Sequence, residues 1–125
     1  MMSKMFKSDD YIDVDGISDA EELKRIARTH SNYSIRIVAV ERITDGEFLK
    51  DLAFDDSNRN VQTACVRRIS DQSHLTYISL NHSNCHVRIE AIKRIENRNV
   101  VEEISKNDSN RLVREYALNV LEKNF

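Results

Sequence analysis

The residues in this chain best suited to bind an anion are two regularly spaced sets of arginines. The first set is Arg36, Arg88 and Arg114, and the second set is Arg42, Arg68 and Arg94. Guanidinium groups at regular spacing are one way to contact the phosphates of a nucleic acid. Each arginine of the second set, however, precedes an Asp or Asn by three residues, where a cation interacts with the negative end of one helix and the cap of the next. We therefore expect both sets to be structural, and a net charge of −2 also argues against duplex nucleic acid as a partner.

A second cluster with possible chemistry is the segment His82–His86, which holds two histidines and Cys85. Imidazole and thiolate groups are zinc ligands, but no second cluster in the sequence completes a tetrahedral site, so we expect no metal. Cys65 occupies an apolar position and should be buried and inert. Cys85 lies near a helix start, where the thiolate form is favoured. It is therefore either a reactive thiol or an ordinary surface cysteine. Two cysteines without a secretory signal indicate a reduced, cytoplasmic protein.

Signatures of catalysis are missing from the sequence. It contains no glycine-rich phosphate loop, no Gly-x-Ser-x-Gly turn, no His-Glu-x-x-His motif and no paired carboxylates at a spacing that would place them in one cleft. We therefore expect neither an enzyme nor a cofactor. We also expect no membrane-spanning helix, because the sequence contains no apolar run of about 18 residues.

The elements that carry these residues follow from an internal repeat. The dipeptide Ser-Asn begins at residues 31, 57, 83 and 109, a constant spacing of 26. Aligned on this period, four columns are apolar in all four copies: Ile35, Val61, Val87 and Val113; Ala39, Cys65, Ala91 and Ala117; Val40, Val66, Ile92 and Leu118; Ile43, Ile69, Ile95 and Leu121. Their spacing is that of one helix face. A repeat of this length predicts stacked structural units.

Each copy contains a second apolar stripe, and polar capping residues separate the two stripes. Asp45, Asp71 and Asn97 can cap the second helix of a copy, and the Ser-Asn pairs can cap the first helix of the next copy. The predicted fold is therefore all-α, an α-solenoid of short antiparallel helix pairs with a 26-residue repeat. This helix-and-cap construction also accounts for a chain with no proline and only two glycines.

The repeat fixes the expected domain organisation. Residues 19–125 should form a single repeat domain of about four helix pairs. Residues 1–18 should form a partly disordered N-terminal cap, in which residues 8–18 are a degenerate first helix. Terminal repeats are atypical in solenoids because one of their faces meets water.

The pattern V-R-x-x-A resembles that of short HEAT-like repeats, including those grouped with the phycobilin lyases, and of the related leucine-rich repeat variants. It stands here as Ile35-Arg36 with Ala39, Val87-Arg88 with Ala91, and Val113-Arg114 with Ala117, whereas the second copy has Gln62 and Cys65. The resemblance implies a solenoid used for binding, with a second helix that is either α or 3₁₀. It also implies an alternative function, a bilin-lyase-like or chaperone-like activity.

The second helices should line the concave face, and their outward residues predict the binding site. Phe54, Tyr77 and Leu80 should form an exposed apolar centre, which acidic residues including Asp51 and Glu103 surround. Interfaces are built in this way from aromatic anchors and a charged rim. We therefore predict a non-catalytic adaptor or scaffold whose partner is a protein or peptide with apolar and basic character.

Two further expectations concern partners. Weak nucleic-acid binding is a second alternative function, and it would use Lys24, Arg25 and Arg28. The chain should be a monomer or a weak dimer, because Leu112, Tyr116 and Phe125 at the C-terminal end offer apolar surface for end-to-end association.

Overall fold

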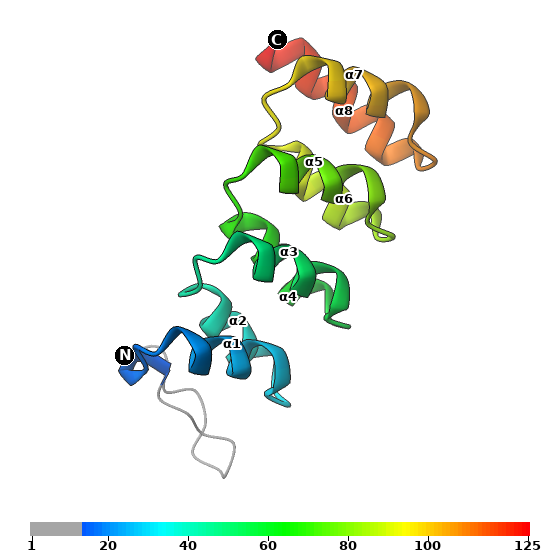
Figure 1. The fold of residues 1–125 in the computed structure, drawn as a ribbon. Coiled ribbons are helices and arrows are strands. Elements are labelled where there is room, and N and C mark those ends of the chain that lie inside the picture. The colour runs from blue at the N-terminus through cyan, green and yellow to red at the C-terminus, as the bar shows by residue number, and fades with distance from the viewer. Residues whose placement is uncertain (1–13) are drawn as a thin grey trace. The chain divides into compact units, whose positions relative to one another are not determined.

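The computed structural model describes residues 14–125, and all regular secondary structure in this range is helical (Figure 1). The elements are the 3₁₀ helix η1 (Val14–Gly16) and the α-helices α1 (Ala20–Thr29), α2 (Tyr33–Val40), α3 (Gly46–Asp55), α4 (Arg59–Arg68), α5 (Gln72–Asn81), α6 (Cys85–Ile92), α7 (Arg98–Asn107) and α8 (Arg111–Asn124). The all-α prediction is therefore confirmed for the described residues.

The helix boundaries follow the 26-residue period of the sequence. The second helices of the copies, α1, α3, α5 and α7, begin at residues 20, 46, 72 and 98, and each has 10 residues. The first helices α2, α4, α6 and α8 begin at residues 33, 59, 85 and 111. All of the second helices are α-helices, which decides between the two predicted geometries. Of the predicted helix over residues 8–18, residues 8–13 lie outside the described range, and Val14–Gly16 form a 3₁₀ turn that buries Val14 completely.

The predicted capping residues begin the helices. Asp45 Oδ1 accepts a hydrogen bond from the Phe48 N–H at 3.2 Å, and Asp71 Oδ1 accepts from the Ser73 N–H at 2.8 Å. At the start of the first helices, Asn84 Oδ1 accepts from the His86 N–H at 2.8 Å, and Asn32, Asn58 and Asn110 act in the same way. Side-chain oxygens thus take the backbone donors that a helix start leaves unpaired.

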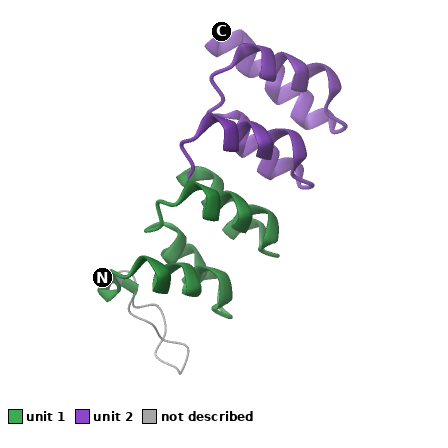
Figure 2. Ribbon diagram, in the orientation of Figure 1, with its two compact units in different colours: residues 1–68 green, residues 69–125 purple. Residues whose placement is uncertain are grey.

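The helices form two compact units, one over the described residues up to Arg68 and one over Ile69–Phe125 (Figure 2). In the first unit α1 packs on α2, α3 packs on α4, and the two pairs meet through α2 and α4. In the second unit α5 packs on α6, α7 packs on α8, and the pairs meet through α6 and α8. Each unit therefore contains two helix pairs joined through their first helices.

The core of each unit consists of the repeated apolar columns. The alanine and cysteine column, Ala39, Cys65, Ala91 and Ala117, is completely buried. Ile35, Val61, Val87 and Val113 are exposed by 1% or less. The prediction is wrong for Leu118, which is 50% exposed although Val40, Val66 and Ile92 in its column are buried. Within its unit α8 packs against α6 and α7, and these contacts leave half of the Leu118 side chain exposed.

Candidate partner-binding site

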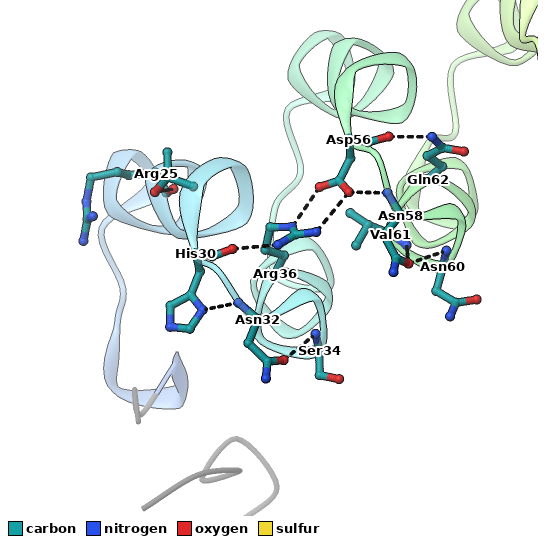
Figure 3. Close-up of polar contacts among 11 residues, drawn as sticks. Arg25, His30, Asn32, Ser34, Arg36, Asp56, Asn58, Asn60, Val61 and Gln62 are labelled. Carbon is teal, nitrogen blue, oxygen red and sulfur yellow. Dashed lines mark hydrogen bonds and ion pairs between the residues drawn. The ribbon is translucent and has the colours of Figure 1, made fainter. Parts of the chain in front are cut away.

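Two members of the first arginine set, Arg36 and Arg88, form ion pairs inside the protein. The third member, Arg114, donates to the Asp108 carbonyl oxygen at 2.7 Å. Figure 3 shows the contacts of Arg36. Arg36 donates from Nε to Asp56 Oδ2 at 2.9 Å and from Nη2 to Asp56 Oδ1 at 3.2 Å, and its Nη1 donates to the His30 carbonyl oxygen at 2.7 Å. In the second unit Arg88 makes the same bonds to Asp108 and to the His82 carbonyl oxygen. A guanidinium that is bidentate to a carboxylate and also bonded to a backbone carbonyl holds the turns of neighbouring repeats together.

The second copy of the repeat lacks both members of this ion pair. Gln62 stands in the arginine column, and its side-chain amide donates to the Asp56 carbonyl oxygen. His82 stands in the column of Asp56 and Asp108, and its Nδ1 accepts from the Asn84 N–H at 3.0 Å, as Asp108 Oδ1 accepts from the Asn110 N–H at 2.9 Å. Both replacements keep a hydrogen bond to the backbone of the turn. Because neither member of the ion pair is present in the second copy, the Arg–Asp pair is found once in each unit.

The second arginine set donates to backbone carbonyl groups of the preceding repeat. Arg68 Nη2 donates to the Ile43 carbonyl oxygen at 3.0 Å, Arg94 Nη1 donates to the Ile69 carbonyl oxygen, and Arg42 Nη1 donates to the Val14 carbonyl oxygen. The structural interpretation of both sets is therefore confirmed. The reason predicted for the second set is incomplete, because these guanidinium groups bridge residues 25 or 28 positions apart rather than serving only the ends of their own helices.

The His82–His86 segment is a turn and a helix start. His82 is buried, and within residues 14–125 no group of three or more His, Cys, Asp or Glu side chains is arranged to hold a metal ion. Both cysteines are free thiols. Burial, followed by the negative charge of Asp56, raises the pKa of Cys65 to about 12, whereas Cys85 is half-buried at the start of α6.

This difference predicts selective thiol labelling. Because only thiolates react quickly with iodoacetamide, Cys65 should stay unmodified in the folded protein while Cys85 reacts. Mass spectrometry at pH 8 should show one label per folded chain and two labels in denaturant. A Cys85→Ser variant should show none until it unfolds. Rapid modification of Cys65 in the native chain would contradict the burial assigned to it.

The basic residues of α1 have partners within the first unit. Arg25 pairs with Glu22, and Lys24 Nζ lies 2.8 Å from Asp45 Oδ2. The guanidinium of Arg28 lies over the Phe48 ring, 4.9 Å from its centroid, and Lys24 Nζ lies 5.6 Å from the same centroid. These contacts compete with the phosphate contacts that the nucleic-acid alternative requires.

The hydrogen bond from Lys24 and the N–H groups at the start of α3 hold the pKa of Asp45 below its ordinary value of 3.8. Its carboxylate therefore stabilises the fold above pH 3.8, and this contribution is lost as the pH falls through the folded-state pKa. An Asp45→Asn variant keeps a capping oxygen, as Asn97 does for α7, but lacks the charge. In thermal unfolding by circular dichroism, the wild type should be more stable than this variant at pH 7. The difference should shrink as the pH falls below 3.8 and vanish below the folded-state pKa. An equal difference at both pH values would contradict the assignment.

The structure places the predicted site residues in two different units. Asp51 and Phe54 lie on α3 in the first unit, whereas Tyr77 and Leu80 on α5 and Glu103 on α7 lie in the second. Tyr77 is 51% exposed, Leu80 is 49% exposed, and Asp51 and Glu103 are exposed. The expectation of exposure is wrong for Phe54, which is half-buried. A large ring at a surface position lowers its free energy by lying against its neighbours. That these five site residues form one patch stays a prediction.

Two shallow hollows lie between α5 and α7 in the second unit, the first of them wide open to solvent, and both are lined by Leu80. The first has a volume of about 420 Å³ and is lined by Gln72, Ser73, Thr76, Tyr77, Leu80, Asn81, Asn97 and Val100. The second, of about 320 Å³, is lined by Leu80, His82, Arg88, Glu103, Ile104, Asn107, Asp108 and Ser109. We call these two hollows together the α5–α7 groove. The structure thus brings Tyr77, Leu80 and Glu103 to one groove.

The groove also contains residues that sequence reasoning missed, above all Val100 and the amides of Asn81 and Asn107. Val100 shares a column of the repeat with Glu22, Phe48 and His74, all of them half-buried. This column flanks the outward columns, and following it along the repeat would have revealed its partly apolar character.

The C-terminal helix carries the surface expected for end-to-end association. Leu112 is 57% exposed and Phe125 is 41% exposed, whereas Tyr116 is half-buried. Leu118 adds a further exposed apolar side chain on α8. Leu112, Leu118 and Phe125 provide control positions for any test of the α5–α7 groove, because they are apolar and exposed but lie outside its described lining.

None of the helices over residues 14–125 is both long enough and apolar enough to cross a membrane. In comparisons with family models, curated proteins and solved structures, nothing matched this chain.

Proposed function

We propose that this chain is a short HEAT-like repeat protein, an α-solenoid that acts in the cytoplasm as a non-catalytic protein-binding module. Its partner binds the outward face of the second helices α1, α3, α5 and α7. The observation that carries the proposal is the exposure of Tyr77 and Leu80 on α5 beside the exposed carboxylate of Glu103 on α7. Neighbouring exposed apolar side chains rimmed by polar residues are typical of protein–protein interaction sites.

The interior of the protein supports the proposal in a second way. The arginines that resemble a phosphate-binding ladder are used in ion pairs and carbonyl bonds within the chain, and Cys65 has the raised pKa of an inert thiol. The repeat residues therefore have structural roles, and the outward side chains of the second helices remain for binding.

Alanine substitution on the proposed face tests this function. Tyr77→Ala should unfold within about 0.5 kcal/mol of the wild type, because Tyr77 is 51% exposed. Phe54→Ala should lose more stability, because Phe54 is half-buried, but this variant should still fold. Both variants should lose a partner that the tagged wild-type chain captures from lysate, as measured by quantitative mass spectrometry. Leu112→Ala removes an apolar side chain of α8 that is 57% exposed, and this variant should capture the partner normally. Normal capture by the Tyr77 and Phe54 variants would overturn the proposal, and unfolding of both would show that these residues belong to the core.

A further inference from the structure

The α5–α7 groove has the dimensions of a short peptide site. Each of its two walls is a helix of 10 residues, which corresponds to about 15 Å. An extended chain advances about 3.3 Å per residue, so the groove accommodates about four or five residues. Leu80 lines both hollows, so the two hollows adjoin at this side chain.

We propose that the α5–α7 groove binds an extended peptide segment that places an apolar side chain in the hollow at Tyr77, Leu80 and Val100 and a lysine or arginine against Glu103. This inference rests on the proposed function and deepens it, because it names the site within the second unit and the chemistry of the partner.

The first hollow suits an apolar side chain. Its described lining residues include no charged side chain, and two of them, Tyr77 at 51% exposure and Leu80 at 49%, are large and exposed. Val100 on α7 is half-buried on the opposite wall. An apolar side chain that enters this hollow removes its own surface and that of Leu80 from water, at about 25 cal/mol for each Å² buried.

The second hollow selects a positive charge. Arg88 and Asp108 line it, but they form an ion pair with each other and cancel in charge. Glu103 is exposed at the same hollow, and its Oε2 accepts a hydrogen bond from Asn107 Nδ2 at 2.7 Å, which orients the carboxylate. The described lining of the groove therefore carries a net negative charge at Glu103, and a basic side chain complements it.

The polar residues of the groove favour an extended segment over a helix. Asn81 and Asn107 line its two walls, and each amide offers two N–H groups and one carbonyl oxygen. One N–H of Asn81 bonds the Tyr77 carbonyl oxygen, and one N–H of Asn107 bonds Glu103. The remaining amide capacity can pair with the backbone of an extended peptide, whereas a bound helix satisfies its own backbone groups internally.

Selection from a display library of random linear peptides on the full chain tests the inference. The selected peptides should share an apolar residue next to a lysine or arginine. In fluorescence polarisation, Tyr77→Ala should weaken a selected peptide about tenfold or more, and Leu112→Ala should leave its affinity unchanged. Glu103→Lys should weaken it by about the same factor and strengthen a version of the peptide whose basic residue is replaced by glutamate.

Two results would overturn the inference. One is a selected sequence without a basic residue, and the other is a peptide whose affinity Glu103→Lys does not change. If no peptide is selected while the chain still captures a protein through Tyr77, the partner is a folded surface; the groove assignment is then wrong and the proposed function stands. If capture of the protein partner from lysate does not depend on Tyr77 and Phe54, the proposed function itself is wrong.

Discussion

Replacing Arg88 with alanine should destabilise the protein by about 3–5 kcal/mol, because it leaves the buried carboxylate of Asp108 without its cation. The Arg88 and Asp108 side chains are 9% and 8% exposed, and the guanidinium bonds both carboxylate oxygens at 3.0 Å and 2.9 Å. Chemical denaturation followed by circular dichroism measures the loss. The same change also removes the bond from Arg88 Nη1 to the His82 carbonyl oxygen at 2.7 Å.

Arg114 provides the matched control for this prediction. It donates to the Asp108 carbonyl oxygen at 2.7 Å, the same backbone bond that Arg88 makes to His82. Gln62 shows that a glutamine in this column can make that bond. Arg114→Gln should therefore cost about 1 kcal/mol or less. If Arg88→Ala lowers the free energy of unfolding by no more than Arg114→Gln does, the ion pair does not hold the repeats together.

A double variant separates the ion pair from the local turn. Arg88→Met with Asp108→Asn removes both charges and leaves an amide oxygen that can accept from the Asn110 N–H as Asp108 does. This double variant should recover a large part of the stability that Arg88→Ala loses, because no unpaired charge stays buried.

Replacing Ile78 with alanine should cost about 2–5 kcal/mol, since this side chain is completely buried in α5 and its removal leaves a cavity. Its neighbour Tyr77 is 51% exposed, so Tyr77→Ala should change stability by about 0.5 kcal/mol or less. The two substitutions differ by one position along the same helix and therefore test its orientation directly. Equal losses in chemical denaturation would show that α5 is rotated from the orientation described.

The helices and their caps could be predicted because their signals are local. Asp45, Asp71 and Asn97 precede apolar stripes at a constant spacing, and an N-cap bonds within three residues of itself. The burial of Cys65 followed in the same way from the alanine column that it shares.

The arginine contacts were harder to predict because they join residues that only packing brings together. Arg36 and Asp56 are 20 residues apart, as are Arg88 and Asp108. A signal for the pair is nevertheless present in the sequence, because Gln62 and His82 replace both members in the same register. The carbonyl partners of Arg42, Arg68 and Arg94 leave no such signal, since any residue supplies a backbone carbonyl group.

The candidate site was predicted only in part, because side-chain exposure depends on neighbours that a helical pattern does not specify. Tyr77, Leu80 and Glu103 lie together on the α5–α7 groove. Phe54 is half-buried, and Leu118 is half exposed although its column is otherwise core.

The central claim is that a protein partner contacts the outward face of the second helices, and photo-crosslinking from defined positions tests it most directly. Benzoylphenylalanine would replace Tyr77, Leu80 or, as a control, Leu112 in the full chain, and the captured partner would be irradiated on each variant. The proposed function predicts covalent adducts from positions 77 and 80 and none from position 112. Adducts from position 112 alone, or from all three positions equally, would contradict the claim.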